Sequence, residues 1–273
     1  MTVINNGVVP ESCVLTIGKF EGIHRGHQIL LTEVIHQAGL MGLASVAMVF
    51  DPHPYIHLSD PAYKPLFSNK ERNHLIENEP LFYNVYDLIT PLELDYLYYY
   101  PFDKNFAILP PEDFCKFLFL DCKAKLVIVG ENFCFGKNRL GDTTTLQNEA
   151  KLYGAEVQIL PTQMTQNLYS DIISTSNIRT LVAKGELKKA QQLLGFPFFA
   201  MGIIKSESEA LDIHLPDNKL LPPDGVYTSN TIIAYAIHRS TTSIGAKIET
   251  RIHDFKIKGM CGELAKIELL DFA

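Results

Sequence analysis

One stretch of this 273-residue chain, residues 14–27, constrains its fold more than any other. It begins with the apolar run Val-Leu-Thr-Ile, which predicts a buried parallel strand. A glycine-rich turn follows, and an apolar stripe over residues 29–38 predicts a helix that begins near His27. A strand that leads into a helix through such a turn is typical of an α/β domain.

The same turn carries groups suited to a polyphosphate. Gly18, Gly22 and Gly26 let the backbone approach a phosphate, and the helix N-terminus offers unpaired N–H groups to an anion. His24 and His27 lie three residues apart, so both imidazoles face the same way on a helical turn. We expect two neutral-to-cationic donors aimed at one point. The alternative is a βα turn that merely contains two histidines, because His-x-Gly-His alone fixes few positions.

The amino-acid composition limits which classes of protein this chain can belong to. Hydrophobic residues make up 47% of the chain and charged residues 20%, which suits a folded protein with a sizeable core. The formal charge of −7 argues against a nucleic-acid partner, which needs a basic face. The five cysteines include no Cys-x-x-Cys pair, so they fit neither a disulfide framework nor a zinc site. With neither a signal peptide nor an apolar run of roughly 20 residues, we expect a cytoplasmic protein with no membrane partner.

Further signals along the chain extend the α/β pattern. A helix between the strands at residues 14–17 and 44–50 gives a βαβ unit with a right-handed crossover. We expect more strands at residues 85–89, 125–129 and 157–160, and helices at residues 68–79, 110–120 and 147–153. The helix at residues 68–79 is polar, and we expect no catalytic or binding residues in it. The dense tyrosines at residues 96–100 predict packing rather than stacking on a base.

Two loops follow strands of the predicted sheet, at the edge where ligands of such sheets bind. Pro52 fixes the first loop and points His53 toward the cleft. The second loop carries Asn132, Phe133 and Phe135, whose rings would wall a flat ring system. The alternatives are a rigid surface turn for the first loop and core-plugging aromatic side chains for the second.

Residues 173–179, Ile-Ser-Thr-Ser-Asn-Ile-Arg, predict a helix start with a possible anion site. Hydroxyl side chains cap helices, and capping alone would explain Ser174 and Ser176. Arg179 is harder to explain as structure, since a cation near a helix N-terminus opposes the macrodipole. A bound anion would resolve that conflict.

Beyond residue 198 the pattern changes to short β-type runs separated by turn signals, which predicts a small antiparallel barrel. These runs cover residues 200–204, 225–228, 231–237, 247–252 and 264–269. We therefore expect an α/β domain over residues 1–185, a linker over residues 186–198 and a shortened β-barrel over residues 199–273.

Four motifs of the first part, in this order, resemble the prokaryotic FAD synthetases, the N-terminal module of bifunctional riboflavin kinase/FMN adenylyltransferases. They are Gly-Lys-Phe-Glu-Gly-Ile-His-Arg-Gly-His (18–27), Phe-Asp-Pro-His-Pro (50–54), Gly-Glu-Asn-Phe-Cys-Phe-Gly (130–136) and Ile-Ser-Thr-Ser-Asn-Ile-Arg (173–179). Glu21 stands where the family more often has Asp, and Asn132 replaces an acid. The resemblance implies a Rossmann-like (HUP-type) nucleotidyltransferase domain that transfers AMP from ATP to FMN, giving FAD and pyrophosphate.

The resemblance also implies a role for each matched residue. The expected catalytic residues are His24, His27 and Arg179. The expected ATP-binding residues are Gly18, Phe20, Gly22, His24, Gly26, His27, Ser174, Ser176 and Arg179. The expected FMN-binding residues are Pro52, His53, Asn132, Phe133 and Phe135. Mg²⁺ would bridge the phosphates, held largely by substrate and water, so no metal ligand is named. We expect ATP and FMN as partners, and a monomer or weak homo-oligomer.

Residues 220–227 and 249–255 are similar to the riboflavin kinase barrel, which makes Glu249 the counterpart of that family's catalytic base. However, the kinase segment Gly-Phe-Pro-Thr-Ala-Asn has no match, since Gly-Phe-Pro at residues 195–197 runs on into Phe198. Because phosphoryl transfer depends on positioning ATP and metal, we expect a degenerate kinase with Glu249 as a vestigial base.

Several alternatives remain open. The barrel would still phosphorylate riboflavin in a bifunctional enzyme, or the same fold would use another phosphorylated acceptor. A non-catalytic flavin- or nucleotide-binding regulator is a further alternative. Class I aminoacyl-tRNA synthetases share the histidine motif, but this chain lacks a Lys-Met-Ser-Lys-Ser loop.

Overall fold

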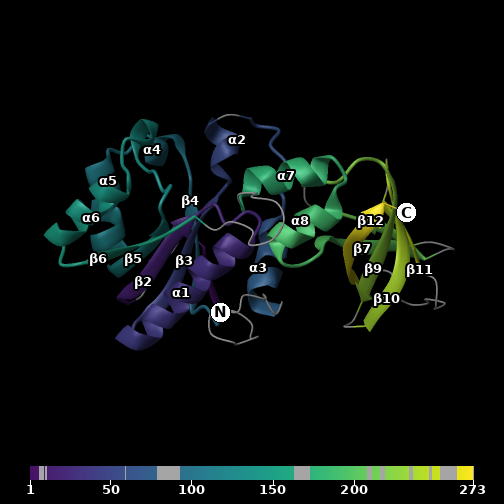
Figure 1. Cartoon of the computed structure of the whole chain (residues 1–273), viewed down its shortest axis with the longest axis horizontal. Helices are drawn as coiled ribbons and strands as arrows, with labels where there is room; N and C mark the ends of the chain where they lie inside the picture. The colour runs from purple at the N-terminus through teal and green to yellow at the C-terminus, as the bar shows by residue number, and fades with distance from the viewer. Residues whose placement is uncertain are drawn as a thin grey trace. The chain divides into compact units, whose positions relative to one another are not determined.

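The computed structural model describes residues 1–5, 9, 11–58, 60–78, 93–162, 173–207, 211–215, 219–233, 236–245, 248–252 and 263–272. The chain divides into two compact units (Figure 1). The first contains Met1–Tyr63 and Ile76–Ile172, and the second contains Lys64–Leu75 and Ile173–Ala273. The chain therefore enters the second unit early, returns to the first, and enters the second again.

The first unit is built on a six-stranded parallel sheet in the order β1-β4-β3-β2-β5-β6. Its strands are β1 (Thr2–Asn5), β2 (Cys13–Gly18), β3 (Ala44–Asp51), β4 (Tyr96–Pro101), β5 (Ala124–Gly130) and β6 (Glu156–Leu160). The strands predicted at residues 14–17, 44–50, 125–129 and 157–160 are confirmed. β2 and β3 are almost entirely buried, as expected for central strands covered on both faces. β1 was not predicted, and the strand expected at residues 85–89 lies outside the described residues.

Three helices of the first unit begin at residues that are typical of helix N-termini. Asp103 and Asp142 accept hydrogen bonds from the backbone at the starts of α4 and α6, and Pro111 is the first residue of α5. The helices are α1 (Arg25–Met41), α2 (Pro54–Leu58), α4 (Lys104–Ala107), α5 (Pro111–Lys116) and α6 (Thr143–Leu152). A π-helical turn, Phe117–Asp121, continues α5, and a 3₁₀ turn, η2, covers Lys137–Arg139. α3 (Asn69–Asn78) spans the boundary between the two units.

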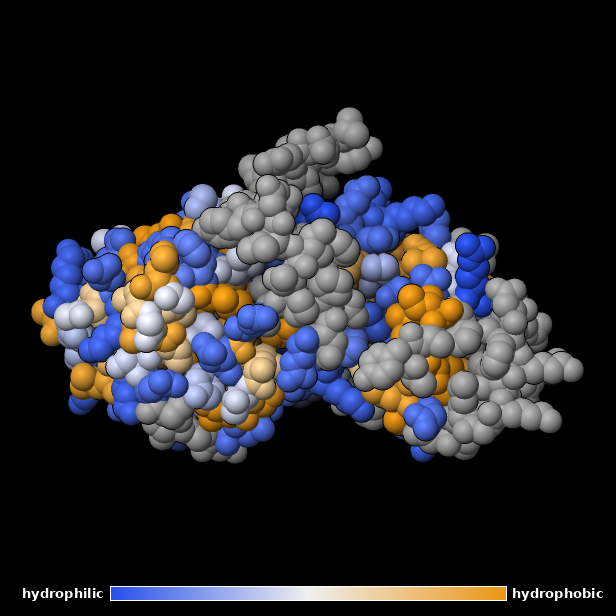
Figure 2. Space-filling view, turned by 90° about the horizontal axis from the view of Figure 1, so that it is seen from below, coloured by the Kyte–Doolittle hydropathy of each residue, from blue (hydrophilic) through white to orange (hydrophobic). Residues whose placement is uncertain are grey.

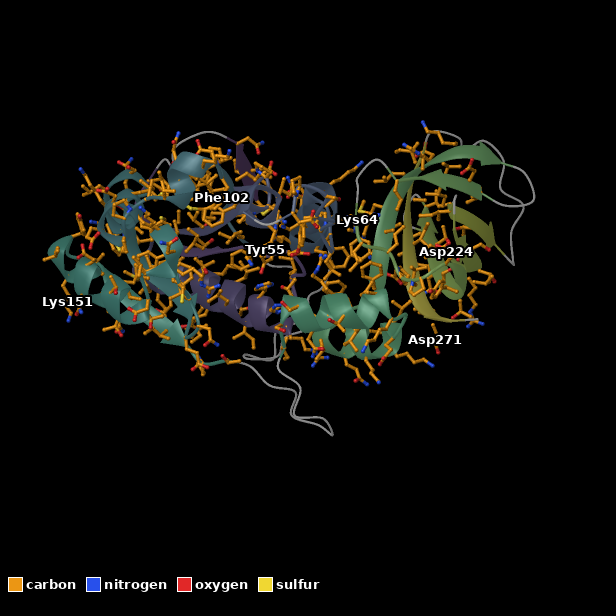
Figure 3. The ribbon with its side chains drawn as sticks, turned by 90° about the horizontal axis from the view of Figure 1, so that it is seen from above. Tyr55, Lys64, Phe102, Lys151, Asp224 and Asp271 are labelled. Atoms are coloured by element: carbon orange, nitrogen blue, oxygen red, sulfur yellow. The ribbon has the colours of Figure 1, made fainter. Side chains whose placement is uncertain are left out.

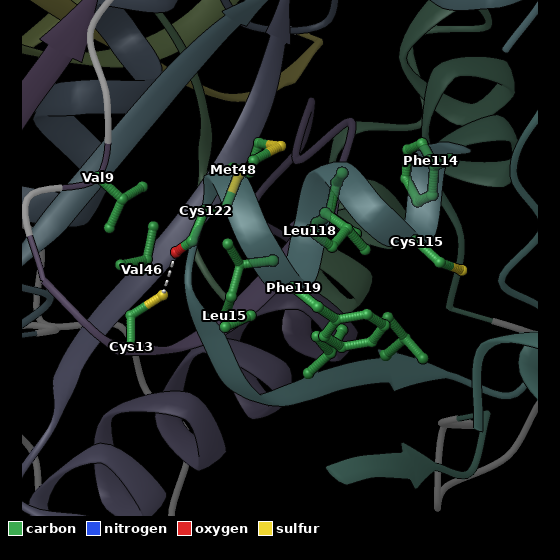
Figure 4. Packing of buried hydrophobic residues seen from close by; sticks show 14 of the residues in the cluster. Val9, Cys13, Leu15, Val46, Met48, Phe114, Cys115, Leu118, Phe119 and Cys122 are labelled. Atoms are coloured by element: carbon green, nitrogen blue, oxygen red, sulfur yellow. Dashed lines mark hydrogen bonds between the residues drawn. The ribbon is translucent and has the colours of Figure 1, made fainter. Parts of the chain in front are cut away.

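One face of the sheet packs against α5 and the π-helical turn through a continuous apolar cluster (Figure 4). Leu15 and Val127 in neighbouring strands are completely buried there. Cys13 donates through its Sγ to the carbonyl oxygen of Cys122 at 3.3 Å, and burial raises the pKa of Cys13 to about 12. Tyr98 packs edge-on against Tyr100, which confirms that the tyrosines of β4 serve packing.

The second unit contains two helices, α7 (Thr175–Ala183) and α8 (Leu187–Leu194), and a closed antiparallel barrel in the order β10-β11-β8-β7-β12-β9. The barrel strands are β7 (Phe198–Glu207), β8 (Leu211–His214), β9 (Gly225–Ile233), β10 (Ala236–Ile244), β11 (Ile248–Ile252) and β12 (Leu264–Phe272). The predicted antiparallel barrel is therefore confirmed. Its buried side includes a chain of hydroxyls 2.8–3.0 Å apart, from Thr231 through Ser240, Ser229 and Thr242 to Thr250.

Three details of this region differ from the sequence predictions. The expected strand at residues 231–237 spans the end of β9 and the start of β10, because one hairpin forms where two runs of similar composition meet. β8 was not predicted. The expected linker at residues 186–198 contains α8, which packs on α7, β7 and β12. The chain enters the second unit for the second time at Ile173, ahead of the boundary expected at residue 185.

None of the described helices is long and apolar enough to cross a membrane. On the face of the first unit shown in Figure 2, hydrophilic and hydrophobic residues are interspersed.

Candidate active site

The turn from β2 to α1 places two imidazoles in contact. His24 is the N-cap of α1, and its Nδ1 accepts a hydrogen bond from the backbone N–H of His27 at 3.3 Å. The two rings stack with centroids 3.7 Å apart and an interplanar angle of 13°. The spacing of the two histidines thus places both rings on one side of the helix N-terminus, as predicted.

Burial determines the charge of His24. His24 is only 6% exposed, and burial lowers its pKa from 6.5 to about 4, although Glu21 partly opposes that shift. His24 is therefore neutral at pH 7. Because its Nδ1 accepts a hydrogen bond, we assign its single proton to Nε2. His24 thus offers one N–H donor and no positive charge, which is narrower than the neutral-to-cationic donor expected from the sequence.

The glycines of the turn leave room for these rings. A Cβ on Gly18 would come within 3.1 Å of the Phe20 ring, and one on Gly26 within 3.3 Å of His24 Nδ1. Phe20 is 1% exposed and its ring lies 5.0 Å from that of His27. The structure therefore places Phe20 behind the histidines, and Gly22 is buried in the same turn.

A buried carboxylate joins this turn to the loop after β3. Glu21 is 1% exposed, and its Oε2 accepts a 2.6 Å hydrogen bond from the Tyr63 hydroxyl. The same oxygen lies 3.2 Å from His53 Nε2, and the rings of His53 and Tyr63 stack at 4.7 Å. His53 Nδ1 also accepts from the backbone N–H of Tyr55 at 3.3 Å. Both ring nitrogens of His53 thus face protein groups.

Two residues near His53 in this loop are exposed. Pro52 is exposed, and Tyr55 is 39% exposed (Figure 3). The Nζ of Lys19 lies 4.0 Å from the centre of the Tyr55 ring. Tyr63 and Tyr55 were not among the predicted site residues, and the sequence pointed to this cluster only through Glu21 and His53.

The two aromatic rings of the loop after β5 differ in burial. Phe135 is 5% exposed and stacks on Phe114 at 4.8 Å, so its ring belongs to the apolar cluster. Phe133 is partly buried and stacks on Phe135 at 5.6 Å. Asn132 is exposed, and its Nδ2 donates to Thr162 Oγ1 at 2.9 Å. Of the two rings, Phe133 is therefore the one at the surface.

In the second unit, the predicted phosphate residues gather at the start of α7. Ser174 is its N-cap, and the Ser174 Oγ accepts from the backbone N–H of Asn177 at 3.3 Å. Ser176 is exposed in the first turn, which contains no acidic residue. Arg179 is half-buried, and its Nη1 donates to the carbonyl oxygen of Lys64 at 2.7 Å. The positive end of the α7 dipole disfavours a cation at this position. The partial negative charge of the Lys64 carbonyl offsets part of that unfavourable interaction.

The kinase-like residues lie on the barrel. Glu249 occupies β11, in register with Asp212 of β8 and Ser243 of β10. The remainder of its motif, residues 253–255, lies outside the described residues. Within the described part of the chain, no group of three His, Cys, Asp or Glu residues is placed to hold a metal ion.

The order of the sheet shows why the β2–α1 turn is the candidate site. β3 lies on one side of β2 and β5 on the other, so the turn sits at a switch point of strand order, where α/β sheets bind ligands. A helix N-terminus with convergent N–H groups at that point suits phosphate. The parallel sheet and its strand order define an α/β protein of the Rossmann-like class.

The chain belongs to the FAD synthetase family, since the family model described as FAD synthetase matches residues 8–176. Two similar proteins come from Listeria monocytogenes serovar 1/2a. One, named bifunctional riboflavin kinase/FMN adenylyltransferase, is 29% identical over 95% of this chain and 83% of its own length. The other, named FAD synthetase, is 29% identical over 86% of this chain and 88% of its own length.

Two further similarities extend this result. The bifunctional riboflavin kinase/FMN adenylyltransferase of Escherichia coli K12 is 30% identical over 80% of this chain and 67% of its own length. A crystal structure titled macrolide-efflux protein from Streptococcus pneumoniae matches with a TM-score of 0.83 and 25% identity, covering 100% of this chain and 91% of that one. Family membership thus agrees with the motifs, and that fold similarity extends over both units.

Proposed function

We propose that this protein is an FMN adenylyltransferase that converts FMN and ATP into FAD and pyrophosphate. Its membership of the FAD synthetase family supports this activity. The observation that carries the proposal is the stacked pair of His24 and His27, at the N-terminus of α1 and the carboxyl end of β2. An FMN phosphate oxygen would attack the α-phosphorus of ATP in line. The bond from that phosphorus to the bridging oxygen would then break and release pyrophosphate.

This reaction needs positioned donors more than a strong base. The second pKa of a phosphate monoester is about 6, so the attacking FMN phosphate is already largely a dianion at pH 7. We therefore assign no residue as a general base. Catalysis would come from in-line alignment and from donors aimed at the charge that develops on the phosphates.

The two groups of phosphate residues would do different work. His24 is neutral at pH 7, so we propose that it and His27 supply N–H donors to the ATP phosphates. Arg179 stays charged, and we propose that it holds the departing β- and γ-phosphates with Ser174 and Ser176. Gly18, Phe20, Gly22 and Gly26 would shape the turn.

On the acceptor side we propose that Phe133 and Asn132 contact the flavin, because both are more exposed than the core residue Phe135. Phe135 would support Phe133 from behind. With both nitrogens of His53 facing Glu21 and Tyr55, we propose that His53 holds the loop of Pro52 in place. That is a narrower role than direct binding of FMN.

Several finer features complete the proposal. We propose that the α/β unit is a HUP-type nucleotidyltransferase domain, that the protein is cytoplasmic, and that it is a monomer or weak homo-oligomer. Mg²⁺ would arrive with ATP and neutralise part of the phosphate charge when bound. Mg²⁺ prefers carboxylate and water oxygens, but the Glu21 carboxylate beside the histidines already interacts with Tyr63 and His53, so we assign no residue as its ligand.

We also propose that the barrel is a degenerate riboflavin kinase with Glu249 as a vestigial base. The missing Gly-Phe-Pro-Thr-Ala-Asn segment supports this, and one relative that matches over 88% of its length is named only FAD synthetase. A bifunctional enzyme is the second candidate, because a relative with that name matches over 95% of this chain.

Product analysis by chromatography tests both candidates. The purified protein is incubated with ATP and Mg²⁺, and with either riboflavin or FMN. FAD from FMN with no product from riboflavin is expected. Formation of FMN and FAD from riboflavin would show that the barrel has kinase activity. No product from either substrate would favour a non-catalytic regulator. The double variant His24→Asn/His27→Asn is the control for contaminating enzyme.

A further inference from the structure

The segment Lys64–Leu75, which we name the anchor segment, belongs to the second unit although its chain neighbours belong to the first. It contains the start of α3, where Ser68 and Glu71 form a reciprocal cap. The Ser68 N–H donates to Glu71 Oε2 at 2.9 Å, and the Glu71 N–H donates to Ser68 Oγ at 3.3 Å. The other oxygen of Glu71 is therefore left to interact outside the helix.

That oxygen reaches the barrel. Glu71 Oε1 accepts from the backbone N–H of Met201 in β7 at 2.8 Å and from Lys219 Nζ at 2.9 Å. Both side chains of the ion pair are 2% exposed. Lys219 Nζ also donates to the Phe199 carbonyl at 2.6 Å and lies 4.7 Å from the centre of the Phe67 ring.

A buried ion pair contributes little net stability even when its partners are satisfied, because desolvation offsets the attraction. What such a pair does provide is a defined geometry for the segments that carry it. Here those segments are the anchor segment, β7 and the residues after Lys219.

A short run of hydrogen bonds leads from this pair to Arg179. Leu220, the residue after Lys219, donates from its backbone N–H to the Pro65 carbonyl at 2.8 Å. The preceding carbonyl, that of Lys64, accepts from Arg179 Nη1 at 2.7 Å (Lys64 is labelled in Figure 3). Two consecutive carbonyls of the anchor segment thus accept hydrogen bonds: that of Pro65 from the Leu220 backbone and that of Lys64 from Arg179.

We propose that Lys219 is a positioning residue for adenylyl transfer, which acts by fixing the carbonyl that orients Arg179. This inference rests on the phosphate-binding role proposed for Arg179. It gives the barrel a part in FAD synthesis that is independent of any kinase chemistry. The barrel would be needed because it holds the anchor segment beside Arg179.

The test compares two buried lysines of the barrel. Lys266 is 7% exposed and its Nζ lies 4.7 Å from the Phe199 ring centre, and it forms an ion pair with Glu268 of its own strand at 3.1 Å. Lys219→Met should raise the KM for ATP about tenfold with a smaller change in kcat, the effect of misplacing one charged hydrogen bond. Lys266→Met should leave that KM within about twofold.

Binding of inorganic pyrophosphate, measured by calorimetry, should weaken in the same way in Lys219→Met and not in Lys266→Met. In the background of Arg179→Ala, Lys219→Met should change neither the KM for ATP nor pyrophosphate affinity further. Additive effects in this cycle would overturn the proposal, because Lys219 would then act by another route.

Lys219→Met alone leaves Glu71 buried without its cation, so it can also destabilise the unit. Glu71→Gln/Lys219→Met removes both charges and keeps an acceptor for the Met201 N–H. If this variant melts like the wild type yet keeps the raised KM, positioning is supported; if the KM returns to normal, the proposal is wrong. Should wild-type protein make FAD and bind pyrophosphate while Lys219→Met behaves identically, only this inference fails and the proposed function stands.

Discussion

The N-termini of α1 and α7 are both predicted to bind phosphate, but they are built from different residues and in different ways. Neither helix has an acidic residue in its first turn, and each is capped by a neutral side chain. At α1 both histidines come from one stretch of sequence, and the His24 cap is 6% exposed and stacked on His27. At α7 the key contact of Arg179 is with Lys64, 115 residues away in the chain. One site is preorganised locally, whereas the other depends on a distant segment.

The largest difference between the two ends should appear in catalysis. His24→Asn keeps a side chain that caps helices but removes the imidazole Nε2 donor. Loss of one preorganised donor to a reacting phosphate typically costs a factor of about 10²–10³ in turnover. We expect that loss in kcat/KM for FAD formation, with a melting temperature near that of the wild type. A variant that retains full activity would remove His24 from the mechanism.

The buried imidazole at α1 should also make stability depend on pH. The pKa of His24 is about 4 when folded and 6.5 when unfolded, so the unfolded chain alone takes up a proton between these values. The contribution is fully present above pH 6.5 and is lost as the pH falls toward 4, by up to about 3 kcal/mol.

Urea denaturation at pH 7 and pH 4.5 measures this effect, with His24→Asn as the control. Between pH 7 and pH 4.5 the wild type should lose more stability than the variant, because only the wild type carries the buried imidazole. Parallel curves for the two proteins would contradict the burial of a neutral His24.

At α7, the expected effect is on substrate affinity. Arg179→Lys keeps the charge but loses the planar fork that can contact Lys64 and a phosphate together. We expect the KM for ATP to rise about tenfold, with weaker binding at higher salt, as measured by steady-state kinetics at two ionic strengths. A KM unchanged in Arg179→Lys would mean that charge alone suffices at this end.

The smallest effect should come from the cap of α7. Ser174→Ala removes the acceptor for the Asn177 N–H and should lower the free energy of unfolding by about 1 kcal/mol. Ser174→Asn keeps a capping acceptor and should restore most of that loss in the same denaturation experiment. If it restores stability but not the KM for ATP, the Ser174 hydroxyl serves the ligand as well as the helix.

The sequence predicted best where structure is local. Short apolar runs were enough to predict the strands β2, β3 and β5. The three-residue spacing of His24 and His27 was enough to predict that their rings lie on the same side of the helix. β1 has four residues and β8 has four, and such short strands carry too little pattern to be recognised. The barrel was predicted as a class, although the single strand expected at residues 231–237 spans a hairpin between β9 and β10.

What the sequence did not predict depends on partners far along the chain. Glu71 was expected in a polar helix with little chemistry, yet it is 2% exposed and pairs with Lys219, 148 residues later. Glu21 and Tyr63 lie 42 residues apart. The position of the Phe135 ring depends on Phe114, which no loop motif specifies. Predictions from short stretches of sequence cannot include these partners, because the paired residues lie far apart in the chain.

The anchor segment also has a consequence for the order of folding. Ribosomes add about 5–20 residues per second, so Glu71 waits roughly 7–30 s for Lys219 to be synthesised. During that interval the start of α3 lacks the strand and the cation that later enclose it. The α/β sheet can therefore form around an unfinished connection, and the barrel completes it last. No single cut of this chain would yield both units intact.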